Sequence, residues 1–385
     1  MENFKLPLLP PPSEIETIEV LRQLSKSHRH LAELKGIVKT IPNEEILINT
    51  LSLQEAKSSS EIENIVTTHD DLYKQNIMIE TQNPASKEVV NYAKGLKMGF
   101  YIVRNEKLLL NKDIIKIQEQ LEQNKAGFRT QAGTKLVNAQ KEVVYTPPQD
   151  KDEILNLMAN LEKFINDPDF SPLDPLTKMA IIHYQFESIH PFYDGNGRTG
   201  RIINILYLVL QNLLDLPVLY LSRYIIQNKT DYYKALQGVR TNNDWQTLIL
   251  YLLKGIEVTA IETIELVEEI KVLMQQTKQR LRSELPKIYS QDLLNNLFKN
   301  PYTKIEFLEK DLNISKRTAQ NYLDMISSIG LLDKIKVGKS NYYTNENLKG
   351  CEISGVTKIL GLRNYAIANN LKITEKDLIY KYVLE

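Results

Sequence analysis

The sequence predicts a mainly α-helical protein with two small parts that contain β-strands. Apolar residues recur at spacings of three and four through most of the 385 residues. Several of these runs begin with a helix-capping pattern, such as Asp174-Pro175. Patterns typical of strands are confined to residues 127–148 and 332–344. We therefore expect a helical bundle with a β-hairpin, followed by a small unit of helices and strands.

Composition places the chain among ordinary globular proteins. It has 48 basic and 48 acidic residues and a formal net charge of zero, which gives no general indication of nucleic-acid or membrane binding. A single cysteine, Cys351, excludes an intramolecular disulfide and suits a reducing compartment. The N-terminus lacks the pattern of a signal peptide, and the apolar run Ile202–Leu214 is too short for a bilayer span. We expect a soluble, cytoplasmic protein without membrane contact.

Two capping boxes predict helices near the N-terminus. Ser13 with Glu16 opens a helix that continues toward Leu34, and the box Ser52–Glu55 opens a second helix over Leu53–Ile65. The second segment has few large apolar residues and many serines, so packing alone explains it poorly. Two of its polar residues are four apart and share one helix face: Ser59 and Glu63.

The next segments predict three helices and a hairpin. Apolar stripes indicate helices over Ser86–Val103, Asn111–Gln123 and Asp152–Phe164. Between the last two helices, residues 127–148 combine a central Ala-Gly-Thr turn with two β-type segments. We expect an irregular β-hairpin from about Phe128 to Tyr145. Its second strand contains Val143, Val144 and Tyr145.

The most informative stretch is His190–Arg201, which reads HPFYDGNGRTGR. A helix capped by Asp174 leads into it. This helix should end at His190, because Pro191 disfavours helical geometry in the residue before it. A second helix begins within the stretch and continues as the following apolar run. The stretch is therefore predicted to be a loop between two helices that also forms the first turn of the second.

The glycines and arginines of this loop suit an anion. Gly195 and Gly197 allow backbone N–H groups to turn toward one point at a helix N-terminus, where the partial charge is positive. Arg198 and Arg201 are three apart on the new helix, so both guanidinium groups can reach one phosphate.

Three further loop residues add chemistry to this anion site. Asp194 would repel a bare phosphate, but it could hold a Mg²⁺ ion that bridges phosphate oxygens. Asn196 can form a hydrogen bond with phosphate without adding charge. His190 can act as a general base near neutral pH.

The twelve residues resemble the signature of the Fic family, HPFx[D/E]GNGRxxR, at every fixed position. Most Fic proteins transfer AMP from ATP to a hydroxyl of a target protein. The resemblance implies that His190 deprotonates the attacking hydroxyl and that Asp194 holds Mg²⁺. It also implies phosphate binding by Gly195, Asn196, Gly197, Arg198 and Arg201. The alternative is a glycine loop whose charged side chains only form ion pairs and contact solvent. Such a loop would not require this order of residues.

Residues 59–64, SSEIEN, resemble the inhibitory motif [S/T]xxxE[G/N] of one Fic class. The resemblance implies that Glu63, with Ser59 beside it in the motif, pairs with Arg201 and displaces the γ-phosphate of ATP. The stretch around the motif also looks like the N-terminal region of that class. A solvated helix with spare glutamates is the alternative.

Other segments are similar to parts of Fic proteins. The hairpin with Val143, Val144 and Tyr145 resembles the flap that pairs with the target backbone, and an ordinary connector is the alternative. Tyr232 and Tyr233 begin a helix where Fic proteins often carry two tyrosines, which can line the base pocket. Core packing is an equal alternative for one of them.

Residues 286–346 are predicted to fold as a separate unit. Helices at Gln291–Lys299, Ile305–Lys310 and Ser315–Ile329 precede two strands joined by a Gly-Lys-Ser turn. This order resembles a winged helix-turn-helix, a common C-terminal attachment in the Fic family. The unit is only mildly basic, which gives little support to DNA binding. A protein-contact or homodimer module fits the sequence at least as well.

The chain therefore divides into four predicted parts: regulatory helices over residues 1–85, the Fic core and a connecting helix over 86–285, the winged helix over 286–346 and a helical tail over 347–385. The resemblance implies a protein adenylyltransferase that uses Mg²⁺ and ATP, modifies a Ser, Thr or Tyr hydroxyl of a target protein and is autoinhibited by Glu63. Two alternatives remain. One is removal of AMP by the same site, and the other is a DNA-binding regulator whose core only senses nucleotide.

Overall fold

The computed structural model describes residues 5–11, 15–68, 71–72, 75, 83–138, 140–337 and 340–348, with the backbone alone at residues 337 and 340. The predicted cap at Ser13, Cys351 and all but the first two residues of the predicted tail lie outside these ranges. The chain forms two compact units, Met1–Val267 and Glu268–Glu385.

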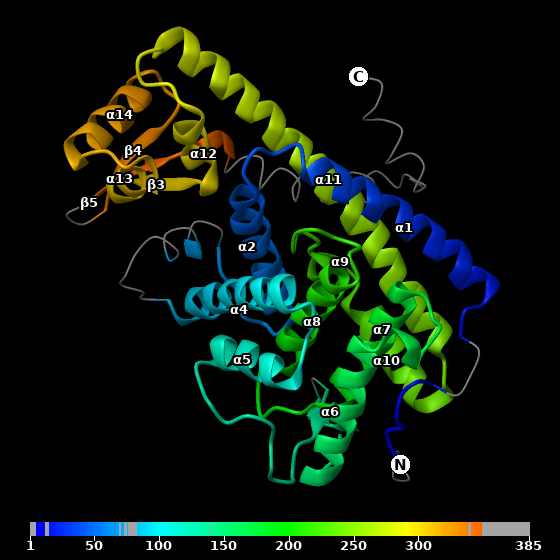
Figure 1. The fold of residues 1–385 in the computed structure, drawn as a ribbon. Helices are drawn as coiled ribbons and strands as arrows, with labels where there is room; N and C mark the ends of the chain where they lie inside the picture. Colours follow the sequence, from blue (N-terminus) through cyan, green and yellow to red (C-terminus); the bar gives the residue numbers. More distant parts are fainter. Residues whose placement is uncertain are drawn as a thin grey trace, which may run out of the picture. The chain divides into compact units, whose positions relative to one another are not determined.

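Helices make up most of the first unit (Figure 1). In chain order they are α1 (Ile18–Val38), α2 (Glu44–Ile62), α4 (Pro84–Glu106), α5 (Asn111–Glu122), α6 (Lys151–Asn166), a 3-10 turn (Pro168–Phe170), α7 (Pro175–Ile189), α8 (Asn196–Leu210), α9 (Leu221–Gln227), α10 (Lys229–Asn242) and α11 (Trp245–Glu284), the last of which continues into the second unit. The prediction of a mainly α-helical protein is confirmed.

Helix α8 is the centre of this bundle, and it packs against α2, α4, α5 and α7. Its apolar residues Ile202, Ile203 and Leu206 are fully buried. Each such side chain stabilises the fold by about 1.5–3 kcal/mol. A Cβ atom on Gly99 of α4 would lie 2.5 Å from Leu206 Cδ1, so glycine is what lets these two helices approach so closely. The helix that follows the glycine-rich loop is therefore fixed on several sides.

The first two helices begin at other residues than the capping boxes predict. Thr17 caps α1, and its Oγ1 accepts a hydrogen bond from the Val20 N–H at 3.4 Å. Ile18 and Leu21 are 64% and 51% exposed. The buried face instead contains Val20 and, one turn later, Leu24.

Helix α2 starts nine residues earlier than predicted, with Asn43 rather than Ser52 as its N-cap. Ser52 and Glu55 lie buried in the middle of the helix. The prediction was wrong because α2 is covered on several faces. Consecutive residues at Ile46–Ile48 are all buried, so no single apolar stripe marks the helix.

Two further elements differ from the prediction in the first unit. The short helix α9 was not expected. The predicted connecting helix is not a separate element, because α11 is continuous from Trp245 to Glu284. Thr259 and Thr263 donate their hydroxyl protons to the carbonyls of Gly255 and Thr259, which keeps these side chains bonded within the helix.

The hairpin is present and irregular, as predicted. β1 (Leu136–Val137) pairs antiparallel with β2 (Val143–Tyr145), and the register shifts within β1. Val143 and Val144 are exposed, whereas Tyr145 is buried. The Tyr145 hydroxyl donates a hydrogen bond of 2.9 Å to the carbonyl of Ser188 near the end of α7. One strand of the hairpin is thereby attached to the helix that leads into the loop.

The second unit contains α12 (Gln291–Lys299), β3 (Tyr302–Lys304), α13 (Ile305–Leu312), α14 (Lys316–Ser328), β4 (Asp333–Val337) and β5 (Ser340–Thr344). The three strands form an antiparallel sheet in the order β3-β5-β4. The sequence predicted β4 and β5 but missed β3, which follows Pro301 and pairs with β5 through Thr303 and Tyr343. The expected combination of a helical bundle, a hairpin and a small sheet with helices is confirmed.

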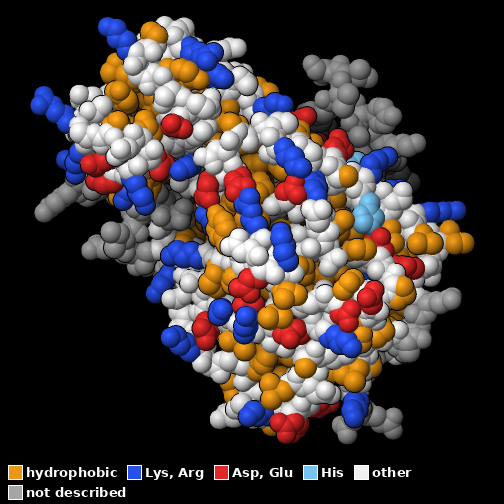
Figure 2. All heavy atoms as spheres, in the orientation of Figure 1, with side chains coloured by type: hydrophobic (Ala, Val, Ile, Leu, Met, Phe, Trp, Pro, Cys, Tyr) orange, Lys and Arg blue, Asp and Glu red, His pale blue; other side chains and the backbone are white. Residues whose placement is uncertain are grey.

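On the face of the molecule in Figure 2, basic and acidic side chains are interspersed among the described residues. This distribution agrees with the zero formal charge of the chain. No helix within the described ranges has both the length and the apolar character of a membrane span.

Candidate active site

The loop between α7 and α8 is held in shape by its own side chains. His190 ends α7 in the left-handed conformation (φ 50°), and Gly195 (φ 77°) precedes α8 in the same region. The Asn196 side chain closes the loop: Oδ1 accepts from the Phe192 N–H at 2.8 Å, and Nδ2 donates to the Phe192 carbonyl at 2.9 Å. The Asn196 amide, expected to bind phosphate, is thus engaged by the loop backbone.

The environment of His190 keeps its imidazole neutral. Burial and the nearby positive charges of Arg129 and Arg240 together lower the pKa of His190 to about 4, although the Glu187 carbonyl and the Glu63 carboxylate act to raise it. The imidazole is therefore neutral at pH 7. A neutral imidazole has one nitrogen lone pair free to accept a proton.

His183 and Tyr232 form a separate, buried pair in the core. The His183 Nε2 lies 2.7 Å from the Tyr232 hydroxyl, and its Nδ1 lies 3.0 Å from Asn204 Nδ2. Burial lowers the pKa of His183 to about 3. Tyr232 is 2% exposed, whereas Tyr233 is 48% exposed. Of the two tyrosines expected at a base pocket, Tyr232 packs in the core and Tyr233 is accessible.

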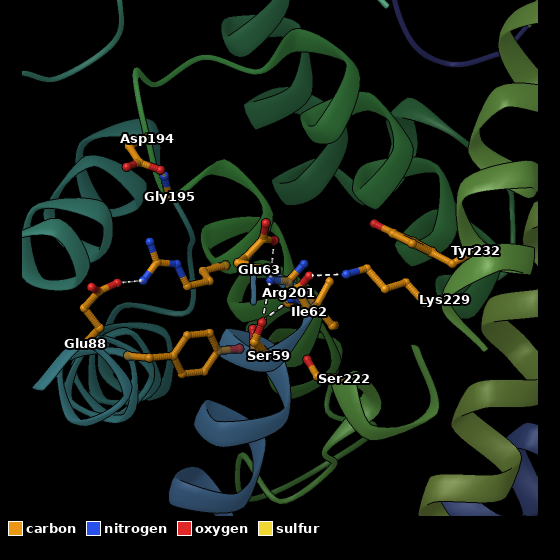
Figure 3. A network of polar contacts seen from close by, with 12 residues as sticks. Ser59, Ile62, Glu63, Glu88, Asp194, Gly195, Arg201, Ser222, Lys229 and Tyr232 are labelled. Carbon is orange, nitrogen blue, oxygen red and sulfur yellow. Dashed lines mark hydrogen bonds and ion pairs between the residues drawn. The ribbon is translucent and has the colours of Figure 1, made fainter. Parts of the chain in front are cut away.

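Arg201 is bound by the C-terminal end of α2 (Figure 3). Its Nε donates to Ser59 Oγ at 2.8 Å, and its Nη2 donates to the Ser59 carbonyl at 3.0 Å and to Glu63 Oε1 at 2.9 Å. The Ser59 carbonyl is available because the Glu63 N–H bonds to the carbonyl of Ser60 instead. The guanidinium, 3% exposed, thus satisfies an unpaired carbonyl at the negative end of a helix.

Glu63 brings its carboxylate into the glycine turn of the loop. A Cβ atom on Gly197 would lie 2.5 Å from Glu63 Oε1, so a side chain there would collide with this oxygen. Burial raises the pKa of Glu63, but Arg201, with help from Arg198 and Lys229, outweighs burial and holds the pKa below its ordinary value. An ionised carboxylate therefore lies where the sequence predicts a binding site for an anion.

Arg198 binds two carboxylates that the sequence did not single out. Its Nη1 donates to Glu88 Oε2 at 2.9 Å, and its Nη2 donates to Glu122 Oε1 at 2.8 Å. Glu122 also lies against Gly195, in the space that a Cβ atom would fill. Glu88 and Glu122 belong to α4 and α5. They are ordinary polar positions of amphipathic helices, so only the packing of the helices reveals their role.

Asp194 lies exposed at the edge of the loop. Its Oδ1 accepts a hydrogen bond from the Gly195 N–H at 2.7 Å, and its backbone carbonyl accepts one from Gln118 Nε2 at 3.2 Å. No cluster of three or more His, Cys, Asp or Glu residues that could hold a metal ion occurs in the described ranges. Mg²⁺ often takes only one or two protein carboxylates and completes its shell with phosphate oxygens and water, so one exposed carboxylate fits such an ion.

The chain is similar to Fic proteins along most of its length. The model of the Fic/DOC family matches residues 109–208, and that of the Fic/DOC family N-terminal region matches residues 21–101. The model of the C-terminal domain of SoFic-like protein adenylyltransferases matches residues 273–348. These matches contain the loop, the α2 region and the three-stranded sheet.

The similar proteins that carry names are called protein adenylyltransferases. The protein adenylyltransferase fic-1 of Caenorhabditis briggsae is 30% identical over 110 residues, which are 29% of this chain and 20% of that protein. A probable protein adenylyltransferase of Aquifex aeolicus (strain VF5) is 28% identical over 186 residues, covering 47% of this chain and 55% of its own length. The chain thus spans about a fifth of the nematode relative and about half of the bacterial one.

Solved structures share the fold. A Fic family protein from Desulfovibrio desulfuricans G20 superimposes with a TM-score of 0.57 at 19% identity, over 87% of this chain and 98% of that one. Fic-1 (residues 134–508) from Caenorhabditis elegans gives a TM-score of 0.50 at 18% identity, over 64% of this chain and 72% of that one.

Proposed function

Because the chain belongs to the Fic/DOC family, we propose that it transfers AMP from ATP to a Ser, Thr or Tyr hydroxyl of a target protein, and that Glu63 keeps this transfer slow. The observation that carries the proposal is the position of the loop. It brings a neutral imidazole, a helix N-terminus with glycines, and two arginines to one place. The names of the relatives support the same reaction.

In this reaction His190 accepts the proton of the target hydroxyl. The hydroxyl oxygen then forms a bond to the α-phosphorus of ATP, the bond from that phosphorus to the bridging oxygen breaks, and pyrophosphate leaves. General-base assistance of this kind typically contributes about 10²–10⁴ in rate. The low pKa of His190 keeps the imidazole in the accepting form throughout the neutral range.

The backbone N–H groups at the start of α8 and the guanidinium of Arg201 would bind the phosphates. Asp194 would hold Mg²⁺, which supplies positive charge to the phosphate oxygens when it is bound. Tyr233 is the accessible tyrosine for contact with the base. The exposed backbone of β2 at Val143 and Val144 would pair with an extended segment of the target protein.

Autoinhibition follows from competition for Arg201. The guanidinium can bind the carboxylate of Glu63 or the γ-phosphate, but one anion excludes the other at Nη2. ATP bound without this contact leaves its α-phosphate out of line with the attacking oxygen. Displacement of reacting groups by about 1 Å lowers a rate about a hundredfold.

The test is labelled AMP transfer with Glu63→Gly as the active parent. Adding His190→Ala should lower transfer by about 10²–10⁴ and leave ATP binding nearly unchanged, because the imidazole is assigned to the hydroxyl proton. Adding His30→Ala, which changes a histidine on α1, is the matched control and should leave transfer unchanged. Near-parental transfer by the His190 variant would remove this residue from the mechanism. Release of AMP from labelled protein by the wild type would instead identify the reverse reaction.

A further inference from the structure

A buried arginine lies beside His190. Arg129 precedes β1 and heads the fully buried side chains of the described residues by size, with no exposed surface. It belongs to the GFRT segment at the start of the hairpin region. The proposed reaction gives it no role.

Three backbone carbonyls accept hydrogen bonds from this guanidinium. Nε donates to the His190 carbonyl at 2.8 Å, and Nη2 donates to the Ile189 carbonyl at 3.3 Å and to the carbonyl of Pro148. The backbone N–H of Arg129 donates to the Pro191 carbonyl at 2.8 Å. These contacts join both ends of the hairpin region to the backbone on either side of the imidazole.

Burial of Arg129 in this way is energetically unfavourable. Within the described ranges, no carboxylate lies at ion-pair distance from Arg129, and its Nη1 is buried without a hydrogen-bond partner. Burial of a charge without a counter-charge is unfavourable, and burial lowers the pKa of Arg129. The carbonyls at the C-terminal end of α7 offset part of this, because that end carries partial negative charge. An apolar side chain would fill the same space without the charge.

The contacts of Arg129 bear on the backbone conformation of His190. This residue has a φ of 50°, in the left-handed region, which few residues other than glycine adopt, although histidine does so more often than most. Its carbonyl would lack a partner in the helix, and Arg129 Nε supplies one. The charged groups that act on the imidazole are Arg129 and Arg240, which favour its neutral form, and Glu63, which opposes them.

We propose that Arg129 is a positioning residue for His190, which holds the backbone of the general base in place and joins it to the hairpin. The proposal rests on the function proposed above. A movement of the hairpin on target binding would then be transmitted to the imidazole through the guanidinium. Because the guanidinium charge also opposes protonation of the imidazole, its removal should raise the pKa of His190.

The experiment compares Arg129→Met and Arg129→Lys in the Glu63→Gly parent, with Arg22→Met on the exposed side of α1 as the control for loss of one positive charge. Arg129→Met should lower kcat for AMP transfer about 10- to 100-fold and change KM for ATP about twofold at most. The acid limb of the rate profile should move up by about one pH unit. Arg129→Lys should keep the acid limb of the parent and recover only part of kcat, because lysine lacks the planar fork.

A second measurement keeps the test independent of the proposed function. The chain has five histidines, so the His190 signal in an NMR titration can be assigned by its loss in His190→Ala. If the parent transfers no AMP, the proposed reaction is wrong, yet a raised His190 pKa in the Arg129→Met protein still supports the positioning role. If Arg129→Met does not fold, the kcat and titration of Arg129→Lys decide. An unchanged titration together with unchanged kcat, or a loss confined to KM, would overturn the proposal.

Discussion

The two arginines of the loop are three residues apart and nearly equally buried, but their partners differ. Arg201 binds one carboxylate, Glu63, and two oxygens of Ser59. Arg198 binds two carboxylates, Glu88 and Glu122, and its Nε has no partner within the described ranges. One guanidinium therefore has a single negative partner that another anion can replace, and the other already has two.

The difference matters because Glu63 and Glu122 have similar positions. Glu63 is the C-cap of α2, and Glu122 is the last residue of α5. The partial negative charge of a helix C-terminus disfavours both carboxylates, so each depends on its arginine. If Glu63 leaves, Ser59 still holds Arg201 in place for a phosphate. If Glu122 leaves, Glu88 still neutralises Arg198. Under the proposed function, Glu63 is therefore the contact that is exchanged for another anion.

The largest effect should come from Arg201. Adding Arg201→Ala to Glu63→Gly should remove the gain in AMP transfer, at least about tenfold, because the freed guanidinium positions the phosphates. Adding Ser59→Ala instead should keep most of the gain, since the Ser59 carbonyl still accepts from Arg201 Nη2. Labelled AMP transfer measures both variants. Full activity without the Arg201 guanidinium would show that Arg201 does not position the phosphates. The difference drawn between the two arginines would then be wrong.

A smaller effect is expected at Arg198. Glu122→Gln should tighten ATP binding about threefold, because it removes one of two anions that compete with phosphate for this guanidinium. Glu119→Gln, one turn earlier on α5, is the matched control and should bind ATP like the wild type. Calorimetric titration gives both values. Weaker ATP binding by the Glu122 variant would mean that this carboxylate orients Arg198 rather than competes for it.

The smallest expected effect is on stability, because Glu63 and Glu122 should make the free energy of unfolding depend on pH in opposite ways. The pKa of Glu63 is lowered in the folded protein, so its ionised form stabilises the fold above about pH 4.5 and this contribution is lost as the pH falls. Glu63→Gln should therefore lower the free energy of unfolding at pH 7, by about 1 kcal/mol or less because the side chain is 38% exposed. The difference should shrink as the pH falls below about 4.5.

Glu122 should behave in the opposite way. Burial raises its pKa, and Arg198 offsets this only in part, with Asp194 and Glu88 adding to the rise. Its ionisation therefore opposes folding as the pH rises above the ordinary carboxyl value, and Glu122→Gln should be neutral or stabilising at pH 7. Thermal unfolding between pH 3 and 8 compares the two variants. A change of the unfolding free energy in the same direction for both variants would contradict the difference assigned to Glu63 and Glu122.

Much of the site could be predicted because its residues are local. His190, Asp194 and the glycines follow one another in the chain, and the turn and helix start are set by Pro191 and Gly195. The contact of Glu63 with Arg201 spans 138 residues, and only the resemblance to a known motif indicated it. The partners Glu88, Glu122 and Arg129 had no such motif, and they become visible only when the helices pack.

Prediction of the fold from the sequence has the same limit. Helices with one apolar face, such as α5 and α6, were predicted to within a few residues. The start of α2 was missed because residues on several of its faces are buried, and periodicity disappears when a helix is covered all round. Tyr232 and Tyr233 are alike in sequence, which left core packing of one of them as an equal alternative. Only the packing distinguishes the buried one from the exposed one.

The most direct test of the account is labelled AMP transfer by Glu63→Gly beside the wild type, including self-modification. Competition between Glu63 and the γ-phosphate for Arg201 predicts a rise of at least about tenfold. Glu63→Asp should give a smaller rise, because a shorter carboxylate can still reach the Arg201 guanidinium. Transfer by Glu63→Gly at the wild-type rate, together with loss of an AMP-removing activity, would contradict the account. Glu63 would then be the base that activates water in the reverse reaction.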